Sequence, residues 1–289
     1  MLHTQVEGSI TTDNEMDRTY KLRQSELKHQ HLVQQTSRHV YDLTFPHHGP
    51  YAFRFDRSGR KGLLMGRRNG GLAVMDMHTL HVVTEFYLRG HSRDEVVRDG
   101  VFLHNHTLFA LAQKHHVFVY DDAGVEIHRL PDHVNVYALE YLPYHFLLAT
   151  IGRSGLLRYH DTSTGDLVLT HRTKVGPCSV LRHDPSNAVV HCRHGNGTVT
   201  LWSPAQRTYL AKMLCHCGAP VTSLAIDLTG HTMITGGHDN QVKIWDLRTY
   251  RSLHSYYTRG GPPTSLDLSQ RNVLGIGHGC HSVSNRQTD

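Results

Sequence analysis

Short apolar segments separated by polar turns fill most of this chain from about residue 41 onward. The clearest example spans residues 221–246, where three apolar segments are separated by Thr229-Gly230 and by Gly237-His238-Asp239. Short runs of β-branched and aromatic residues interrupted by Gly, Asn and Asp predict β-strands joined by tight turns. An acidic side chain at such a turn, here Asp239, can accept hydrogen bonds from exposed backbone amides. The pattern predicts an antiparallel unit that closes with the pair Trp245-Asp246.

The end of this unit recurs four times earlier in the chain. Successive ends are 40 to 45 residues apart and fall at Asp76, Asp121, Asp161, Ser203 and Asp246. This spacing is typical of propeller blades built from four strands. Because a single blade cannot bury both of its faces, the copies predict a ring in which each blade packs against the next. We therefore expect an all-β fold, a WD40 β-propeller with five complete blades, within residues 41–289.

A sixth unit begins in the same way and then loses the pattern. Residues 263–269 and 273–278 match the first two segments of the unit above, but residues 282–289 lack apolar alternation. We expect an incomplete or atypical sixth blade. Propellers usually hide their strand edges by pairing the last blade with a strand from the opposite terminus. Residues 41–45 are the available strand.

Two arrangements of the ring follow from this ending. In the first, residues 41–45 pair with residues 273–276 or with a strand that contains Val283, and residues 284–289 are disordered. In the second, a seventh position is open and is filled by a partner or by a C-terminal segment that this sequence lacks.

Residues 1–40 differ from the repeats because they are polar and contain no proline. Good helix formers fill residues 17–35, with Met16, Tyr20 and Leu27 at helical spacing, while other apolar residues interrupt this face. We expect an N-terminal α-helical arm without a strongly apolar side. It either packs on its own propeller or extends to a partner.

Composition narrows the function further. The 30 Lys and Arg residues against 25 Asp and Glu give a formal net charge of +5, a modest excess that suits an anionic partner. The 27 histidines add little charge at pH 7 because their reference pKa is about 6.5. The sequence contains no apolar run of the ~18 residues that span a membrane and no signal peptide, and its five cysteines are an odd number. We expect an intracellular protein in a reducing compartment, with no membrane partner.

Candidate chemical sites are weak. The dense Cys/His clusters are Cys215-His216-Cys217 and His278-Gly279-Cys280-His281, and neither has the paired spacing of a zinc site. The run Gly275-x-Gly277-x-Gly279 lacks the Gly-Lys-Ser/Thr and the helix of a phosphate loop. Since a nucleophile elbow is also missing, we expect no enzyme activity, metal, cofactor or small-molecule substrate.

Basic residues at the predicted turns are the candidate binding residues. Such residues contact RNA phosphates without reading sequence, so turns at one end of a propeller could form a basic rim for RNA. The alternative is that they are ordinary solvated turn charges. The residues are Arg57, Arg60, Lys61, Arg67 and Arg68 on adjacent turns of the first blade, with Lys114 and Arg153 at equivalent turns of the next two blades.

Several phrases resemble one family closely. They are Gly49-Pro50-Tyr51, Phe102-Leu103-His104-Asn105, Phe109-Ala110-Leu111-Ala112-Gln113-Lys114, Phe146-Leu147-Leu148-Ala149-Thr150 and Asn196-Gly197-Thr198-Val199. Over about residues 8–280 the chain is similar to nucleolar WD-repeat proteins of the BING-four type, the seventh of the U3-associated proteins of the small-subunit processome. That family continues past its last blade into a C-terminal region, which we expect to be missing here.

The resemblance implies a non-enzymatic nucleolar scaffold for the particle that matures 18S rRNA. Its implied partners are other processome proteins, with pre-rRNA or U3 small nucleolar RNA as possible direct contacts. A generic WD40 adaptor, such as a ubiquitin-ligase substrate receptor or a chromatin-complex subunit, is the alternative.

Overall fold

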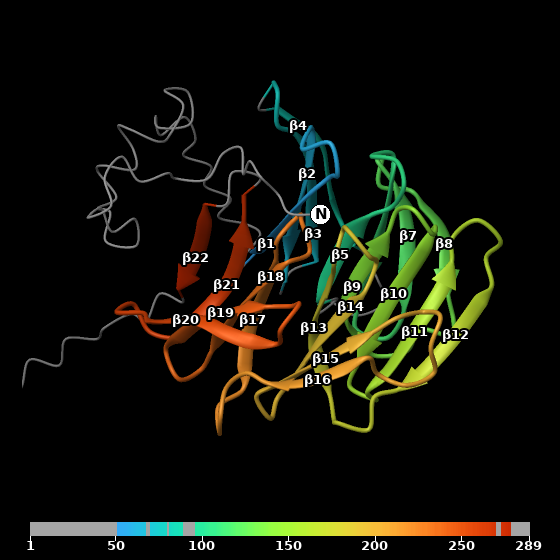
Figure 1. Ribbon diagram of the computed structural model, residues 1–289. Coiled ribbons are helices and arrows are strands. Elements are labelled where there is room, and N and C mark those ends of the chain that lie inside the picture. The colour runs from blue at the N-terminus through green and yellow to red at the C-terminus, as the bar shows by residue number, and fades with distance from the viewer. Residues whose placement is uncertain (1–50, 68–69, 80, 89–95, 270–272, 279–289) are drawn as a thin grey trace, which may run out of the picture.

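The computed structural model describes residues 51–67, 70–79, 81–88, 96–269 and 273–278, and these residues form strands and turns. Six antiparallel sheets stand around a common centre like the blades of a propeller (Figure 1). The predicted WD40 β-propeller is confirmed, with five four-stranded sheets and a sixth that has two strands in the described part. No described helix is long and apolar enough to cross a membrane.

Each of the first five sheets contains four consecutive strands, hydrogen-bonded in chain order. Sheet one has β1 (Tyr51–Phe55), β2 (Lys61–Gly66), β3 (Gly71–Asp76) and β4 (His81–Tyr87). Sheet two has β5 (Asp99–Phe102), β6 (Leu108–Ala112), β7 (Val117–Asp121) and β8 (Glu126–Leu130). Sheet three has β9 (Val136–Leu142), β10 (Leu147–Gly152), β11 (Leu156–Asp161) and β12 (Leu167–Arg172).

The remaining sheets follow the same order. Sheet four has β13 (Cys178–His183), β14 (Val190–His194), β15 (Thr198–Trp202) and β16 (Ala211–Leu214). Sheet five has β17 (Val221–Ile226), β18 (Thr232–Gly237), β19 (Gln241–Asp246) and β20 (Arg251–Tyr257). Sheet six pairs β21 (Pro263–Leu268) with β22 (Leu274–His278), as the match to the fifth unit predicted.

The predicted unit, which closes with Trp245-Asp246, covers three of the four strands of sheet five. That pair ends β19, the third strand of sheet five, and β20 follows as a fourth, outermost strand. All seven residues of β20 are exposed, and its sequence mixes Arg, Ser and His with apolar residues. A strand with water on both faces needs no alternation of apolar and polar residues, so the pattern did not reveal it.

Several sequence predictions fall outside the described residues. They concern the N-terminal arm at 1–40, the pairing of residues 41–45, the start of the first blade at 45–50, Val283 and the end of the chain at 284–289.

Apolar clusters between neighbouring sheets hold the described ring together. Leu63 of sheet one packs with Phe109 of sheet two, and Tyr159 of sheet three packs with Trp202 of sheet four. Further clusters join sheets two and three, four and five, and five and six. No such cluster joins sheet six to sheet one among the described residues. Each sheet therefore gains its core from its neighbours, as expected for a repeat that cannot bury both faces alone.

A hydrogen-bond relay fixes sheet five to the link that precedes it. The Trp245 indole Nε1–H donates to Thr235 Oγ1 at 3.0 Å, and that hydroxyl lies 3.1 Å from His216 Nε2. His216 Nδ1 lies 3.0 Å from Asp239 Oδ2. Asp239 also accepts the backbone N–H of Gln241 at 3.2 Å, so the predicted turn role of Asp239 is confirmed.

The up-and-down path of every sheet gives the propeller two different ends. One end carries the turns between second and third strands and the links from sheet to sheet, and we call it the connection end. The other carries the turns between first and second and between third and fourth strands, and we call it the turn end. Every turn of a described sheet belongs to one of these two ends.

Candidate nucleic-acid interface

The structure does not gather the predicted basic residues on one rim. Arg57 and Arg60 lie between β1 and β2 and Lys61 begins β2, all at the turn end, whereas Arg67 follows β2 at the connection end. The single rim expected from the sequence is wrong because successive turns of an antiparallel sheet lie at opposite ends. Arg68 lies outside the described residues.

At the turn end, two of the three predicted residues are engaged with neighbouring sheets. The Arg57 guanidinium donates to Tyr144 Oη at 2.8 Å and lies 4.8 Å from the centre of that ring. Lys61 Nζ donates to Asp122 Oδ2 at 3.2 Å, and this hydrogen bond is the main cause that lowers the pKa of Asp122. These contacts link sheet one to sheets two and three, which gives both side chains a structural role.

At the connection end, the predicted residues are free of such contacts. Arg67, Lys114 and Arg153 are exposed, and their side chains form no ion pair with the described part of the chain. They lie in the turns between second and third strands of sheets one, two and three. Three neighbouring sheets therefore each present an exposed cation at this end that has no ion-pair partner among the described residues.

Further basic residues, which the sequence analysis did not select, lie at the same end. Lys174 lies in the link from sheet three to sheet four, and Arg259 in the link from sheet five to sheet six, and both are exposed. Arg98 lies in the link to sheet two, where it packs 4.4 Å from the Tyr137 ring centre. These residues lie in links between blades and not in a turn that recurs in every blade, so the repeat pattern of the sequence does not point to them.

The two ends differ in charge. Among described turns and links, the connection end has six basic residues and two acidic ones, which are Arg67, Arg98, Lys114, Arg153, Lys174 and Arg259 against Asp132 and Asp239. The described turns of the opposite end have four basic and five acidic residues, which are Arg57, Arg60, Arg207 and Arg248 against Asp56, Asp122, Asp166, Asp184 and Asp227.

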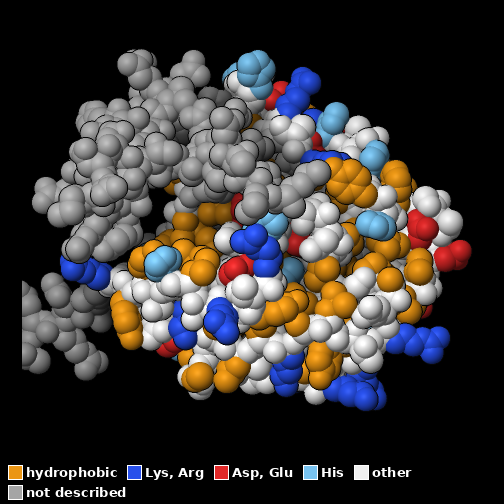
Figure 2. Space-filling view, viewed as in Figure 1, with side chains coloured by type: hydrophobic (Ala, Val, Ile, Leu, Met, Phe, Trp, Pro, Cys, Tyr) orange, Lys and Arg blue, Asp and Glu red, His pale blue; other side chains and the backbone are white. Residues whose placement is uncertain are grey.

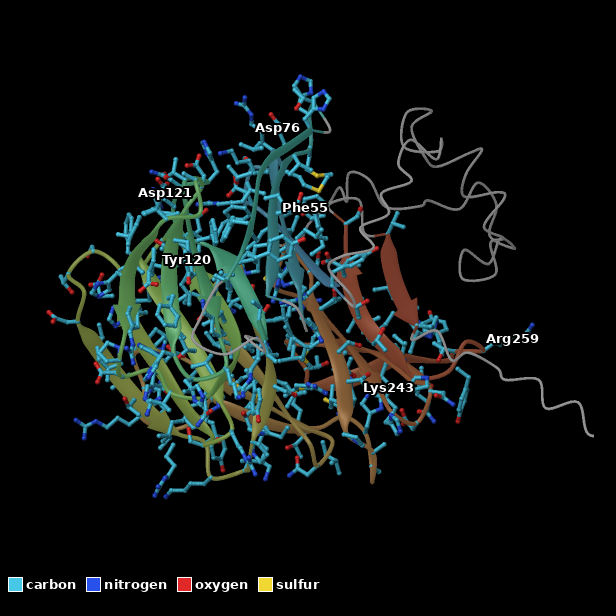
Figure 3. All side chains as sticks on the ribbon, turned by 180° about the vertical axis from the view of Figure 1, so that it is seen from behind. Phe55, Asp76, Tyr120, Asp121, Lys243 and Arg259 are labelled. Carbon is cyan, nitrogen blue, oxygen red and sulfur yellow. The ribbon has the colours of Figure 1, made fainter. Side chains whose placement is uncertain are left out.

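Figure 3 labels residues of both ends: Asp76 and Asp121 close β3 and β7 at the turn end, and Arg259 lies in the link from sheet five to sheet six at the connection end. Lys and Arg side chains are visible at several places on the face that Figure 2 shows. The modest net charge of the chain is thus unevenly distributed.

A second charged cluster lies at the centre of the ring, where the first strands of neighbouring sheets meet. Arg54 on β1 lies 3.4 Å from Asp99 on β5 and 3.9 Å from Glu140 on β9. Glu140 also contacts Arg182 at 3.5 Å and His183 at 2.8 Å, both on β13. The cluster joins four sheets with nearly balanced charge, so it serves as a connector and not as an anion site.

The pKa of Glu140 reflects this setting. Burial raises it, but the hydrogen bond with His183 and the charges of Arg54 and Arg182 outweigh burial and lower it to about 2. Glu140 is therefore ionised at any physiological pH. Nothing in the local sequence reveals the cluster, because its members are spread from residue 54 to residue 183.

The Cys/His run at residues 215–217, considered above for metal or thiol chemistry, contributes to packing and hydrogen bonding within the fold. His216 of the Cys215-His216-Cys217 run belongs to the relay of sheet five, and burial raises the pKa of Cys215 to about 12. A protonated, buried thiol is a poor nucleophile and metal ligand. Gly275 and Gly277 pair with Asp267 and Ser265 inside sheet six, while residues 279–281 lie outside the described residues.

Comparison with known proteins agrees with the observed repeat. A family model described as "WD domain, G-beta repeat" matches residues 207–246. The match includes β16, the last strand of sheet four, and the first three strands of sheet five. The sequence repeat is thus offset by one strand from the structural blade, which explains why the repeats end at the third strand.

Three relatives match nearly the whole chain. U3 small nucleolar RNA-associated protein 7 of Saccharomyces cerevisiae is 40% identical over 95% of this chain and 48% of its own length. WD repeat-containing protein 46 of Mus musculus is 40% identical over 90% of the chain and 41% of its own length. The protein of that name from Caenorhabditis elegans is 37% identical over 95% and 46%. The chain spans less than half the length of these relatives.

Proposed function

Because this chain is related over nearly its whole length to the family of U3 small nucleolar RNA-associated protein 7 and WD repeat-containing protein 46, we propose that it is a non-enzymatic scaffold of the small-subunit processome. The observation that carries the proposal is 40% identity over 95% of the chain to a protein whose name records association with U3 small nucleolar RNA. A propeller supports such a role, since its two ends and its outer strands offer several separate surfaces to partners.

The proposal includes partners and location. The partners are other proteins of the particle together with pre-rRNA or U3 small nucleolar RNA, and the location is the nucleolus. The scaffold needs no cofactor, membrane or small-molecule substrate, and it acts by placing partners relative to one another.

Depletion tests this function directly. We expect loss of the protein to lower 18S rRNA and to spare the large-subunit rRNA, because only the small-subunit precursor loses a component. Northern analysis of both mature species and their precursors measures this. Equal loss of the two rRNAs, or of neither, rejects the proposal.

Association gives an independent test. The tagged protein should sediment with precursor particles and should co-purify U3 small nucleolar RNA. Co-purification with a ubiquitin ligase or a chromatin complex, without U3 RNA, would instead assign the propeller to a general adaptor role.

We also propose that residues 1–40 form a docking arm separate from the propeller, because their composition differs from that of the blades. Deletion of residues 1–38 should leave the thermal unfolding midpoint of the propeller nearly unchanged and release the protein from its particle. A large fall in the midpoint with retained association would place the arm within the propeller core.

A further inference from the structure

Five exposed cations surround the connection end. Arg67, Lys114 and Arg153 lie on sheets one to three, Lys174 links sheets three and four, and Arg259 links sheets five and six. None of the five forms an ion pair with the described part of the chain. Lys and Arg side chains with this distribution match a chain of phosphates better than a single small anion, since they lie in turns and links of different sheets.

Exposed tyrosines lie at the same end. Tyr257 is the last residue of β20 and pairs with Gln241, the first residue of β19. Its hydroxyl accepts a hydrogen bond from Gln241 Nε2 at 2.9 Å, while 76% of the residue remains exposed. The ring is therefore held at one atom and open to solvent, two residues before Arg259.

Sheet one repeats this arrangement. Tyr87 is the last residue of β4, pairs with Gly71 at the start of β3, and is 46% exposed. The two tyrosines occupy equivalent positions in their sheets, at the outer margin of the connection end. An aromatic ring beside a cation is the usual platform on which single-stranded nucleic acids stack their bases.

We propose that the connection end binds single-stranded RNA, with the five cations along the phosphates and Tyr257 stacked on a base. The inference deepens the scaffold function and depends on it for the source of the RNA in the cell. Duplex RNA fits less well, because paired bases are not available to stack on a tyrosine. An acidic protein segment would use the cations but would gain nothing from Tyr257.

Fluorescence anisotropy of the full chain with a labelled 20-nucleotide oligouridylate tests the proposal. A triple variant with Lys114→Ala, Arg153→Ala and Lys174→Ala removes three cations from the connection end. At roughly 0.7 counterions per contact it should flatten the salt dependence by about 2 and weaken binding about 100-fold at 0.1 M salt. The matched control removes three cations from the turn end by Arg57→Ala, Arg60→Ala and Arg248→Ala, and should change binding less than threefold.

The stacking part has its own pair of variants. Tyr257→Ala should weaken binding of the single strand about fivefold to 100-fold, the range measured for loss of one stacked base. Tyr250→Ala removes an exposed tyrosine, 48% accessible, from the turn end and should have no effect. Circular dichroism melting shows whether each variant folds. Tyr257→Phe keeps the aromatic ring and should retain binding, so it tests stacking even if Tyr257→Ala does not fold.

Other outcomes overturn the inference. Equal losses in the two triple variants mean that only overall charge matters. Duplex RNA that binds as tightly as the single strand, or a Tyr257→Ala protein that binds normally, removes the single-strand assignment. Tighter binding of polyglutamate than of oligouridylate would assign the surface to an acidic protein. Because these measurements use purified protein, they can fail while the depletion experiment still gives loss of 18S rRNA, and the reverse also holds.

Discussion

Three buried histidines make the stability of this propeller sensitive to mild acid. His191 and His194 lie on β14, and His133 lies in the link between sheets two and three. Burial lowers the pKa of His191 and of His194 to about 4, and burial together with His160 and Arg158 lowers that of His133 to about 3. All three rings are therefore neutral in the folded protein at pH 5.5.

Burial outweighs the groups that favour a protonated ring, which are Asp184 and the Val189 backbone for His191 and the Gly176 backbone for His194. Within the described residues, both ring nitrogens of His191 lack a hydrogen bond of regular geometry, as do Nδ1 of His194 and Nε2 of His133. In sheet five the equivalent of His133 is His216, which has a carboxylate beside its second nitrogen. Without such a carboxylate, a proton on the ring would be buried with its charge unpaired, which is costly.

The sign and size of the change in unfolding free energy with pH follow from the difference between the histidine pKa values of the folded and unfolded states. The unfolded chain binds protons at these histidines with a pKa of about 6.5, whereas the folded chain does not until pH is near 4 or below. The free energy of unfolding should thus fall as pH falls through this window. Between pH 7 and pH 5.5 each histidine contributes a loss of about 1.2 kcal/mol, or about 3–4 kcal/mol for the three together.

His191→Leu is the simplest perturbation because, within the described residues, neither ring nitrogen makes a hydrogen bond of regular geometry. Urea unfolding at pH 7 and at pH 5.5 gives two free energies for each protein, and their difference is the measured quantity. The variant should lose about 1.2 kcal/mol less than the wild type on acidification. His254→Leu, at an exposed position of β20, is the control and should keep the full pH dependence. An identical pH dependence in wild type and His191→Leu would refute the reasoning, whatever the stability at pH 7.

Three further results are expected. Glu140→Ala should lower the unfolding free energy in urea by about 2–3 kcal/mol, because it removes the carboxylate that pairs with Arg182 and one of the two beside Arg54, and a loss under 1 kcal/mol would contradict this. Thr235→Val should lower the unfolding free energy by about 2 kcal/mol in the same assay, since Trp245 and His216 lose the hydroxyl that both contact. An unchanged unfolding free energy would mean that the relay does not stabilise the fold. Slow amide exchange at Leu43 and Phe45 together with Leu274 and Ile276 would support closure of the ring by residues 41–45, and fast exchange at both strands in the isolated protein would mean an open ring.

The number of complete blades could be predicted because the repeated pattern lies on buried strands. The third strands end in matching positions and pack in the cores between sheets, as Trp202 and Trp245 do. The fourth strands could not be recognised in the same way. β8 and β20 are mostly exposed, so packing imposes little constraint on their residues.

The sequence was less informative about which candidate binding residues lie near one another than about where the strands are. Turn residues such as Arg57 and Arg67 look alike in sequence, and only the direction of each strand decides which end they occupy. The dense run Cys215-His216-Cys217 attracts notice as chemistry, yet His216 is constrained by a hydroxyl and a carboxylate from β18 and the following turn. The central cluster around Glu140 depends on four sheets meeting, which no local pattern encodes.

The acidity of the turn end has a local cause that the basicity of the connection end lacks. Asp56 and Asp184 in these turns, and Asp161 and Asp246 at the strand ends beside them, each accept a backbone N–H from the adjoining turn, at 2.7 to 2.9 Å. These aspartates are explained by turn chemistry without any partner.

Turns at both ends contain residues at positive φ, among them Gly59 at the turn end and Gly155 and Gly197 at the connection end. Among the described residues, Arg67, Lys114, Arg153 and Lys174 form no side-chain ion pair, so no such contact explains a cation at these positions. A charge that the fold does not require is better evidence for a partner than one that it does. Of the two ends, the connection end is therefore where an anionic partner should be sought.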